Sequence, residues 1–464
     1  MSKTDLLLRF SYACSMAENK KPQPKKRSLP HTRAVQRDRS KRANGIPPDE
    51  VLIEQMEAVI HPAVYAQMDI YYAMGLRVRI LTLPVMVAFV LGLIWRQLGS
   101  VREAVRVLHE EGMLWLEPLE GVSPQAVLER MTSLPAVLFY RVLLECVPQM
   151  QARAEARQRP LPPAVAWARQ HFQAIWALDG STLDGLLRKC GLLQEKEGPV
   201  LGGKIGTLFD VATHMPAHIW YEEDSQAHDA GFWPQVLTVL TRGCLLLLDK
   251  GLIDFAIFDE LSERQVGFIT RPKSNTQMQV RQVLSKTATV HDALIRLGSG
   301  PKQCAHPMRL VKVLFRGKWY AYLTNVLDPV VLPAECVVAL YDQRWRIEDA
   351  FNVVKRLLGL AYFHTGSLNG LQVQLWATWL LYTLLVDLTD AVAEALHRPF
   401  KEVSLEMVFR GLYHFAQAHH KGRADDPVEY FARKARDLAL IKYKRPKKRL
   451  SLIEQMELTI PSIP

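Results

Sequence analysis

The 464-residue chain lacks paired metal-binding cysteines, a secretory signal and any apolar run of membrane-spanning length. Its six cysteines are widely spaced and none forms a C-x-x-C pair, which excludes zinc fingers and ribbons and favours a reducing compartment. The longest uncharged apolar run, residues 80–95, is shorter than the roughly 18–20 residues that a membrane helix needs. We therefore expect inert thiols, a buried helix at 80–95, no membrane segment and a cytoplasmic protein.

Positive charge is concentrated in two short stretches. Residues 20–42 and 442–449 hold 16 of the 58 Lys and Arg residues but one of the 47 acidic residues, which leaves 42 basic and 46 acidic residues elsewhere. Stretches this charged do not fold alone, and clusters of Lys and Arg neutralise phosphates. Nucleic acid is therefore the favoured partner, with a solubilising tail or a nuclear address as the alternatives.

Two continuous apolar runs predict an α/β core. Residues 174–178 and 244–248 suit central strands that are covered on both faces. The region before them has helical spacing, with a helix start at Ser123-Pro124 that fits either a helix-turn-helix or a plain bundle. β-type stretches recur between 272 and 337, and from residue 338 to about 396 the pattern is helical.

One helical segment gathers polar residues on a narrow stripe. At 100° per residue, Tyr341, Arg344, Glu348 and Lys355 fall within an arc of about 60°, beside an apolar face. A carboxylate between phosphate-binding cations is what a metal-assisted phosphoryl-transfer site on DNA requires. An amphipathic helix with an Arg344–Glu348 ion pair explains the same pattern, and both interpretations stand.

Two aspartates directly follow the apolar runs. Asp179 comes after 174–178 and Asp249 after 244–248. Ligands of open α/β sheets bind at the carboxyl ends of the strands, so we expect both aspartates at one edge of the sheet. With Glu348 they make an all-oxygen donor set that suits Mg²⁺ or Mn²⁺. The neighbouring acidic residues are expected to be helix caps or solvated charges: Asp184, Asp254, Asp259 and Glu260.

Two further motifs favour other functions only weakly. Residues 198–205 nearly fit the phosphate-binding loop of ATPases, but Ile205 replaces the hydroxyl ligand and a strand pattern follows where a helix should begin. His214, His218 and His228 could suggest a transition-metal cluster, but Pro216 breaks the helix that would bring the first two together. We expect turn and strand-face histidines instead.

Taken together, the residues resemble the DDE transposases of bacterial insertion sequences, specifically the insertion-sequence-four group. The signature of that group, Y-x2-R-x3-E-x6-K, is matched at every spacing by the stripe from Tyr341 to Lys355. The stretches that follow Asp179 (Gly-Ser-Thr) and Asp249 (Lys-Gly) are similar to the contexts of the two family aspartates. Residues 268–275 and 323–325 also look familial, and the resemblance covers about residues 75–400.

The resemblance implies an α/β fold with an RNase H-like catalytic core, interrupted by a β-rich insertion and flanked by helical regions. It implies that Asp179, Asp249 and Glu348 are catalytic and hold two Mg²⁺ ions, about 3.5–4 Å apart, for which Mn²⁺ could substitute. The expected parts are a basic tail (1–48), a helical DNA-binding domain (49–165), the catalytic core (166–271 and 338–385), the insertion (272–337) and a helical carboxyl-terminal region with a basic end (386–464).

The resemblance also implies cut-and-paste transposition. The protein would cut at transposon ends and join them to target DNA as a homodimer, and a hairpin intermediate is one route that the resemblance allows. Trp319 is expected either to stack on a flipped base or to pack within the insertion. The expected DNA contacts are Tyr341, Arg344, Lys355, Trp319, Arg271 and Lys273.

Two other functions remain open at this point. One is a catalytically silent DNA-binding relic or regulator that keeps the fold. The other is an RNase H-like nuclease without strand transfer, which the cationic stripe from Tyr341 to Lys355 disfavours because such a stripe suits the holding of a DNA end.

Overall fold

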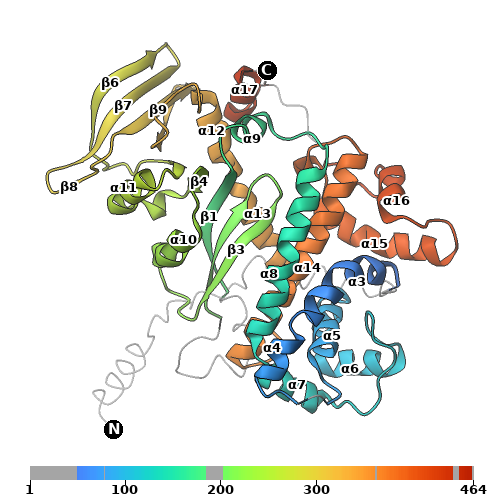
Figure 1. Ribbon diagram of the computed structural model, residues 1–464. Coiled ribbons are helices and arrows are strands. Elements are labelled where there is room, and N and C mark those ends of the chain that lie inside the picture. The colour runs from blue at the N-terminus through green and yellow to red at the C-terminus, as the bar shows by residue number, and fades with distance from the viewer. Residues whose placement is uncertain (1–49, 78, 184–201, 361–362, 443–448, 462–464) are drawn as a thin grey trace, which may run out of the picture.

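Figure 1 shows the fold, a computed structural model that describes residues 50–77, 79–183, 202–360, 363–442 and 449–461. The basic tail expected at 1–48, most of the second basic stretch at 442–449 and Asp184 lie outside these residues.

The amino-terminal region is helical, as its spacing predicts. The apolar run at 80–95 contains a helix with 12 buried residues out of 13, which confirms the buried helix expected there. Ser123 caps the helix that follows it by accepting a hydrogen bond from the backbone N–H of Ala126. The helices are α3 (Glu50–Tyr65), α4 (Met68–Ala73), α5 (Leu83–Trp95), α6 (Val101–Glu110), α7 (Pro124–Ser133), α8 (Ala136–Ala156) and α9 (Pro163–Ala168).

One mixed sheet forms the centre of the molecule. Within the described residues it has ten strands in the order β3-β2-β1-β4-β5-β10-β9-β7-β6, with β8 paired to β7. β1 runs parallel to β4, and β4 to β5, while the other pairs are antiparallel. The first five strands are β1 (Ala174–Thr182), β2 (Lys204–Asp210), β3 (Met215–Glu222), β4 (Cys244–Leu248) and β5 (Gly267–Thr270).

The β-type stretches between 272 and 337 extend the same sheet. They form β6 (Met278–Lys286), β7 (Val290–Ser299), β8 (Lys302–Gln303), β9 (Met308–Phe315) and β10 (Lys318–Thr324). β10 joins them to β5 through the pair Leu323–Thr270. The insertion is therefore continuous with the central sheet and not a separate sheet.

The helical segment after residue 333 is interrupted, so the prediction of continuous helix from residue 338 to about 396 is wrong in detail. It contains α12 (Ala334–Gln343), α13 (Trp345–Asn352), a π-helical turn η4 (Val353–Leu357) and α14 (Leu368–Ala395). At Arg344 and Ile347 the backbone tightens to hydrogen bonds with the third residue before each. Gly359, with φ of +77°, then ends the helical run in a left-handed conformation.

Helices cover both faces of the sheet (Figure 1). One face packs against α12, α13, α14 and α8, and the other packs against η2 (Asp229–Phe232), α10 (Trp233–Val239), η3 (Lys250–Leu252) and α11 (Phe255–Glu263). The chain ends in η5 (Phe400–Glu402), α15 (Leu405–His420), α16 (Pro427–Lys434) and α17 (Leu452–Thr459). The expected boundaries at 165 and 385 fall inside α9 and α14.

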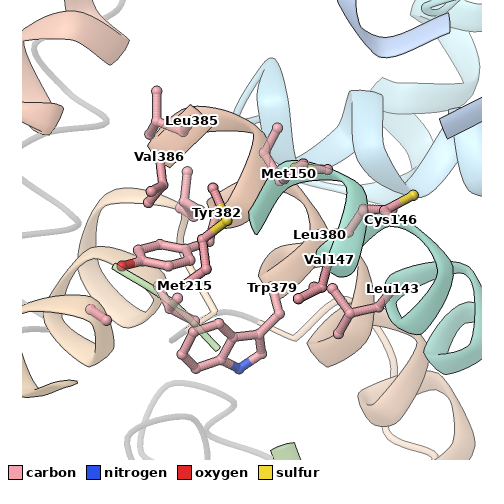
Figure 2. Close-up of a cluster of buried hydrophobic side chains, with 14 of the residues drawn as sticks. Leu143, Cys146, Val147, Met150, Met215, Trp379, Leu380, Tyr382, Leu385 and Val386 are labelled. Atoms are coloured by element: carbon pink, nitrogen blue, oxygen red, sulfur yellow. The ribbon is translucent and has the colours of Figure 1, made fainter. Parts of the chain in front are cut away.

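The long helix α14 joins the amino-terminal helices to the sheet. By length and composition it could cross a membrane, but 83% of its most apolar window is buried inside the structure. Figure 2 shows Trp379 and Leu380 of α14 packed with Val147 of α8. The hydroxyl of Tyr382 donates to the carbonyl oxygen of His214 at 3.0 Å, which ties α14 to the turn between β2 and β3.

Candidate active site

The strand register brings the two aspartates together. Leu178 of β1 pairs with Leu248 of β4, so Asp179 and Asp249 are the next residues on two neighbouring parallel strands. Asp249 directly follows β4, as expected. β1 continues through Thr182 because it also pairs with β2, so Asp179 lies inside a strand and not at its end.

Arg344 connects three carboxylates. Its Nη1 lies 2.9 Å from Asp179 Oδ2, and its Nη2 lies 3.2 Å from Glu348 Oε1 and 3.8 Å from Asp249 Oδ1. The Arg344 side chain is 6% exposed, whereas those of Asp249 and Glu348 are each 36% exposed. Arg344 occupies the tightened turn between α12 and α13, which places it beside Asp179 of β1 and Asp249 after β4, with Glu348 one turn further along. The fold thus brings together, around Arg344, all three carboxylates that the sequence predicts.

Burial and charge act in opposite directions in this cluster. Burial raises the pKa of Asp179 to about 6, although the Arg344 guanidinium pulls it down. Burial alone would lower the pKa of Arg344, but the facing carboxylates, with Asp179 foremost, reverse this and raise it. Arg344 therefore stays charged and offsets part of the negative charge of the cluster.

Tyr341 and Arg271 border the cluster on one side. Burial raises the pKa of Tyr341, and its ring meets the ring of Tyr322 edge-on at 5.5 Å. The Arg271 guanidinium lies over the rings of Tyr320 and Tyr322, at 5.7 and 5.8 Å. Aromatic and cationic groups thus form a continuous series of contacts from β10 to Tyr341, beside Arg344.

Lys355 turns toward β1. Its Nζ donates to Ser181 Oγ at 2.6 Å and to the carbonyl oxygen of Thr182 at 2.5 Å. The π-helical turn η4 changes the spacing of the stripe, so Lys355 reaches the strand that carries Asp179. All four residues of the stripe therefore lie around one site.

Trp319 and Lys273 are not brought to the carboxylates. Trp319 alternates along β10 with Tyr320 and Tyr322, so its ring lies on the opposite face of the sheet. The ring is 40% exposed and packs on His291, with 4.4 Å between centroids, so it is not part of the core of the insertion. Lys273 is exposed and lines a separate cavity of about 960 Å³ beside α11.

A second ion pair lies next to Asp179. Lys204 Nζ is 2.8 Å from Asp229 Oδ1, and a Cβ on Gly180 would overlap that oxygen. The negative charge of Asp229 contributes to the raised pKa of Asp179. Sequence reasoning missed this pair, because the two residues are 25 positions apart and Asp229 stands in no recognisable motif.

The three carboxylates have the donor chemistry that suits a hard divalent cation, but the guanidinium of Arg344 lies between them. Three carboxylates supply the oxygen ligands that Mg²⁺ or Mn²⁺ prefers. However, no group of three His, Cys, Asp or Glu side chains within the described ranges is close enough to hold an ion as it stands. The three carboxylates surround the guanidinium, so Arg344 occupies the space between them.

The other motifs adopt the structures expected of them. Lys204 begins strand β2, and no helix follows it, which excludes a phosphate-binding loop of the ATPase type. His214 is buried and stacked on Phe400, and His218 stacks on Trp220, so the histidines form no cluster. Asp254 caps α11, and Asp259 accepts backbone hydrogen bonds from Ala305 and His306.

Comparison with known proteins indicates the class. Residues 198–384 match the family model of the transposase DDE domain. The match includes Asp249 and Glu348 and begins after Asp179. The relatives reported below carry the names of transposases, one of them belonging to an insertion sequence.

The first of these relatives is the transposase y4zB of Sinorhizobium fredii, 29% identical over 226 residues. Another is the transposase for insertion sequence element IS5377 of Geobacillus stearothermophilus, 25% identical over 199 residues. The alignments cover 47% and 42% of this chain and 62% and 51% of the relatives. A solved structure, the piggyBac transposase synaptic complex with hairpin DNA, aligns with 87% of this chain and 85% of its own at 11% identity and a TM-score of 0.38.

Proposed function

We propose that the protein is a DNA transposase that cuts at transposon ends and joins them to target DNA. The observation that carries the proposal is the convergence of Asp179, Asp249 and Glu348 on Arg344, from two parallel strands and a helix. The match to the transposase DDE domain and the names of the relatives support the same class.

The order and directions of β1 to β5 support an RNase H-like core. In such a core the three carboxylates would hold two divalent ions, which supply Lewis-acid activation of the attacking oxygen and of the phosphodiester. The neighbouring side chains of the protein position the DNA. Arg344, Tyr341 and Lys355 orient the phosphates of the DNA end, and Arg271 extends the cationic surface along β10.

Phosphate binding by Arg344 is the step that would free the carboxylates. The guanidinium forms bidentate contacts with phosphate as readily as with carboxylate. A DNA phosphate that attracts Arg344 therefore exposes the oxygen atoms of Asp179 and Glu348 to a cation. Transposon-end DNA, target DNA and a second copy of this chain are the partners of the proposed reaction, and a hairpin intermediate is its proposed route.

The test is an assay with Mg²⁺, a plasmid that carries the ends of the element and a naked target. Excision plus insertion supports the proposal. Cleavage alone would indicate an RNase H-like nuclease, and binding without cleavage would indicate a silent relic or regulator.

Single substitutions then assign the carboxylates. Asp179→Ala, Asp249→Ala and Glu348→Ala should each abolish cleavage and leave end binding largely intact. Asp224→Asn is the matched control, because this aspartate is exposed and its carboxylate accepts a hydrogen bond from the nearby backbone N–H of Gln226. Substantial Mg²⁺-dependent cutting by Glu348→Ala would exclude it from the site.

A further inference from the structure

The strands of residues 278–324, here called the basic ribbon, form a surface almost free of acid. The stretch holds eight Lys and Arg residues and one acidic residue, Asp292. Asp292 is buried against Arg309, with 2.6 Å between Oδ2 and Nη2, and both side chains are at most 4% exposed. The other seven cations make no ion pair with a described residue: Arg281, Lys286, Arg296, Lys302, Lys312, Arg316 and Lys318.

The shape of the basic ribbon leaves one face accessible. β6 is an edge strand whose residues are nearly all exposed, and Figure 1 shows β6 and β7 projecting away from the helical regions. Val280 and Val283 are 54% and 58% exposed. Two register shifts interrupt the pairing of β6 with β7, and such bulges hinder edge-to-edge pairing with a second copy.

One row of cations crosses this face beside an aromatic pair. Lys286 pairs with His291, His291 with Lys312, and Lys312 with Ala321, so their side chains share a face across four strands. Trp319 lies two residues from Ala321 on the same face, and its ring packs on that of His291 with the two planes tilted by 33°. The arrangement places two lysines around a preformed pair of rings, of which Trp319 is exposed and His291 half-buried.

We propose that this face of the basic ribbon binds the backbone of duplex DNA at a second site, separate from the carboxylates. Lys286 and Lys312 share this face and form no ion pair with a described residue, so the face is complementary to a polyanion, and lysines contact phosphates as point charges. The face is opposite to the one on which Tyr322 meets Tyr341, so the DNA segment that it holds is not the one that contacts Arg344. The choice of DNA as the polyanion rests on the proposed function.

The experiment measures binding of the full chain to a short duplex without element ends, in EDTA, over a series of KCl concentrations. Lys286→Gln combined with Lys312→Gln should lower the log–log salt slope by about 1.8, or roughly 0.9 per lost phosphate contact. Trp319→Ala should weaken binding at every KCl concentration and leave the slope unchanged, because it removes a contact but no charge. Lys434→Gln combined with Arg436→Gln, on the far side of the fold, is the charge-matched control and should leave the slope as in the wild type.

The outcomes separate this proposal from the transposase proposal. An unchanged slope in the ribbon double variant, with a native melting curve, would overturn the second site. A change in oligomeric state without a change in slope would also overturn it and identify the face as an interface between copies. If the wild type does not cut DNA but the slope falls as expected, the second site stands and the transposase proposal fails.

Discussion

The carboxylate of Asp229 lies directly against the Cα of Gly180, the residue that follows Asp179. Gly180 pairs with Gly206 across β1 and β2, and the ring of Phe232 packs on Gly206. Because neither glycine has a side chain, η2 packs directly against the backbone of β1 and β2 at these positions. A side chain at either position would push η2 away from the strand that carries Asp179.

Gly180→Ala should lower the free energy of unfolding by about 1–3 kcal/mol, the usual cost of forcing extra atoms into a packed site. The added methyl group would displace Asp229 and Lys204, and β1 would shift with them. DNA cleavage should therefore fall more steeply than the stability alone predicts. Urea denaturation and a nicking assay measure the two effects.

Gly231→Ala provides the control. Gly231 lies in η2, the same helical turn as Asp229, and a Cβ at this position meets no atom within 4 Å. Its effect on stability should stay within about 0.5 kcal/mol. Equal effects of the two variants would show that the contact between Gly180 and Asp229 is unimportant.

Much of the sheet could be predicted because its strands are continuous apolar runs. The strand pattern noted around Ile205 is observed as β2 (Lys204–Asp210), and the run at 244–248 coincides with β4. The site carboxylates were identifiable because Asp179 and Asp249 directly follow such runs. Their adjacency depends on the parallel register of β1 and β4, which local sequence does not specify.

What the sequence could not predict depends on long-range packing. No proline or glycine near Arg344 marks the break between α12 and α13 in the sequence. The break arises where the helical segment bends beside β1 and β4. The face on which Trp319 lies depends on the register of β10 with β5 and β9. The pair Lys204–Asp229 forms only when the loop after β3 returns to β1.

Arg344→Gln should strengthen the binding of Mn²⁺ to the free protein by several fold and yet reduce cleavage. The guanidinium competes with a cation for three carboxylates, so its removal leaves the negative charge uncompensated. The same change removes a phosphate ligand, which weakens the complex with the cleaved end. Calorimetric titration with Mn²⁺ and gel-shift assays separate the two effects.

Arg346→Gln is the control for this experiment, since Arg346 lies on α13 but pairs with Asp349 at 2.9 Å, away from the cluster. Mn²⁺ affinity that falls in Arg344→Gln, or that rises equally in both variants, would refute the competition between Arg344 and the metal.

Asp390→Asn should lower the free energy of unfolding by about 3–5 kcal/mol. Asp390 is fully buried on α14, pairs with Arg159 and lies 3.2 Å from Arg157. Its neutralisation leaves a buried Arg159 without its counter-ion. Glu103→Gln, which breaks the exposed pair with Arg106, should cost at most about 1 kcal/mol. Similar losses in the two variants, measured by urea denaturation, would show that the buried pair has no special weight.

The stability of the fold should fall in acid because of His214. Its ring is buried and stacked on Phe400, with 4.3 Å between centroids, and burial, aided by Arg159, Arg346 and Lys442, lowers its pKa well below the usual value. Below about pH 6.5 the unfolded chain takes up a proton at this residue while the folded protein does not. The stabilisation is therefore present above about pH 6.5 and is lost progressively as the pH falls toward the pKa of the folded state, by up to about 1.4 kcal/mol per pH unit.

His214→Asn removes the titrating group and suits the backbone φ of +60°, because Asn tolerates the left-handed region. Urea denaturation of both proteins at several pH values between 4 and 8 should give a steeper loss of stability in the wild type than in the variant; parallel curves would mean that His214 takes up its proton in the folded state as readily as in the unfolded chain.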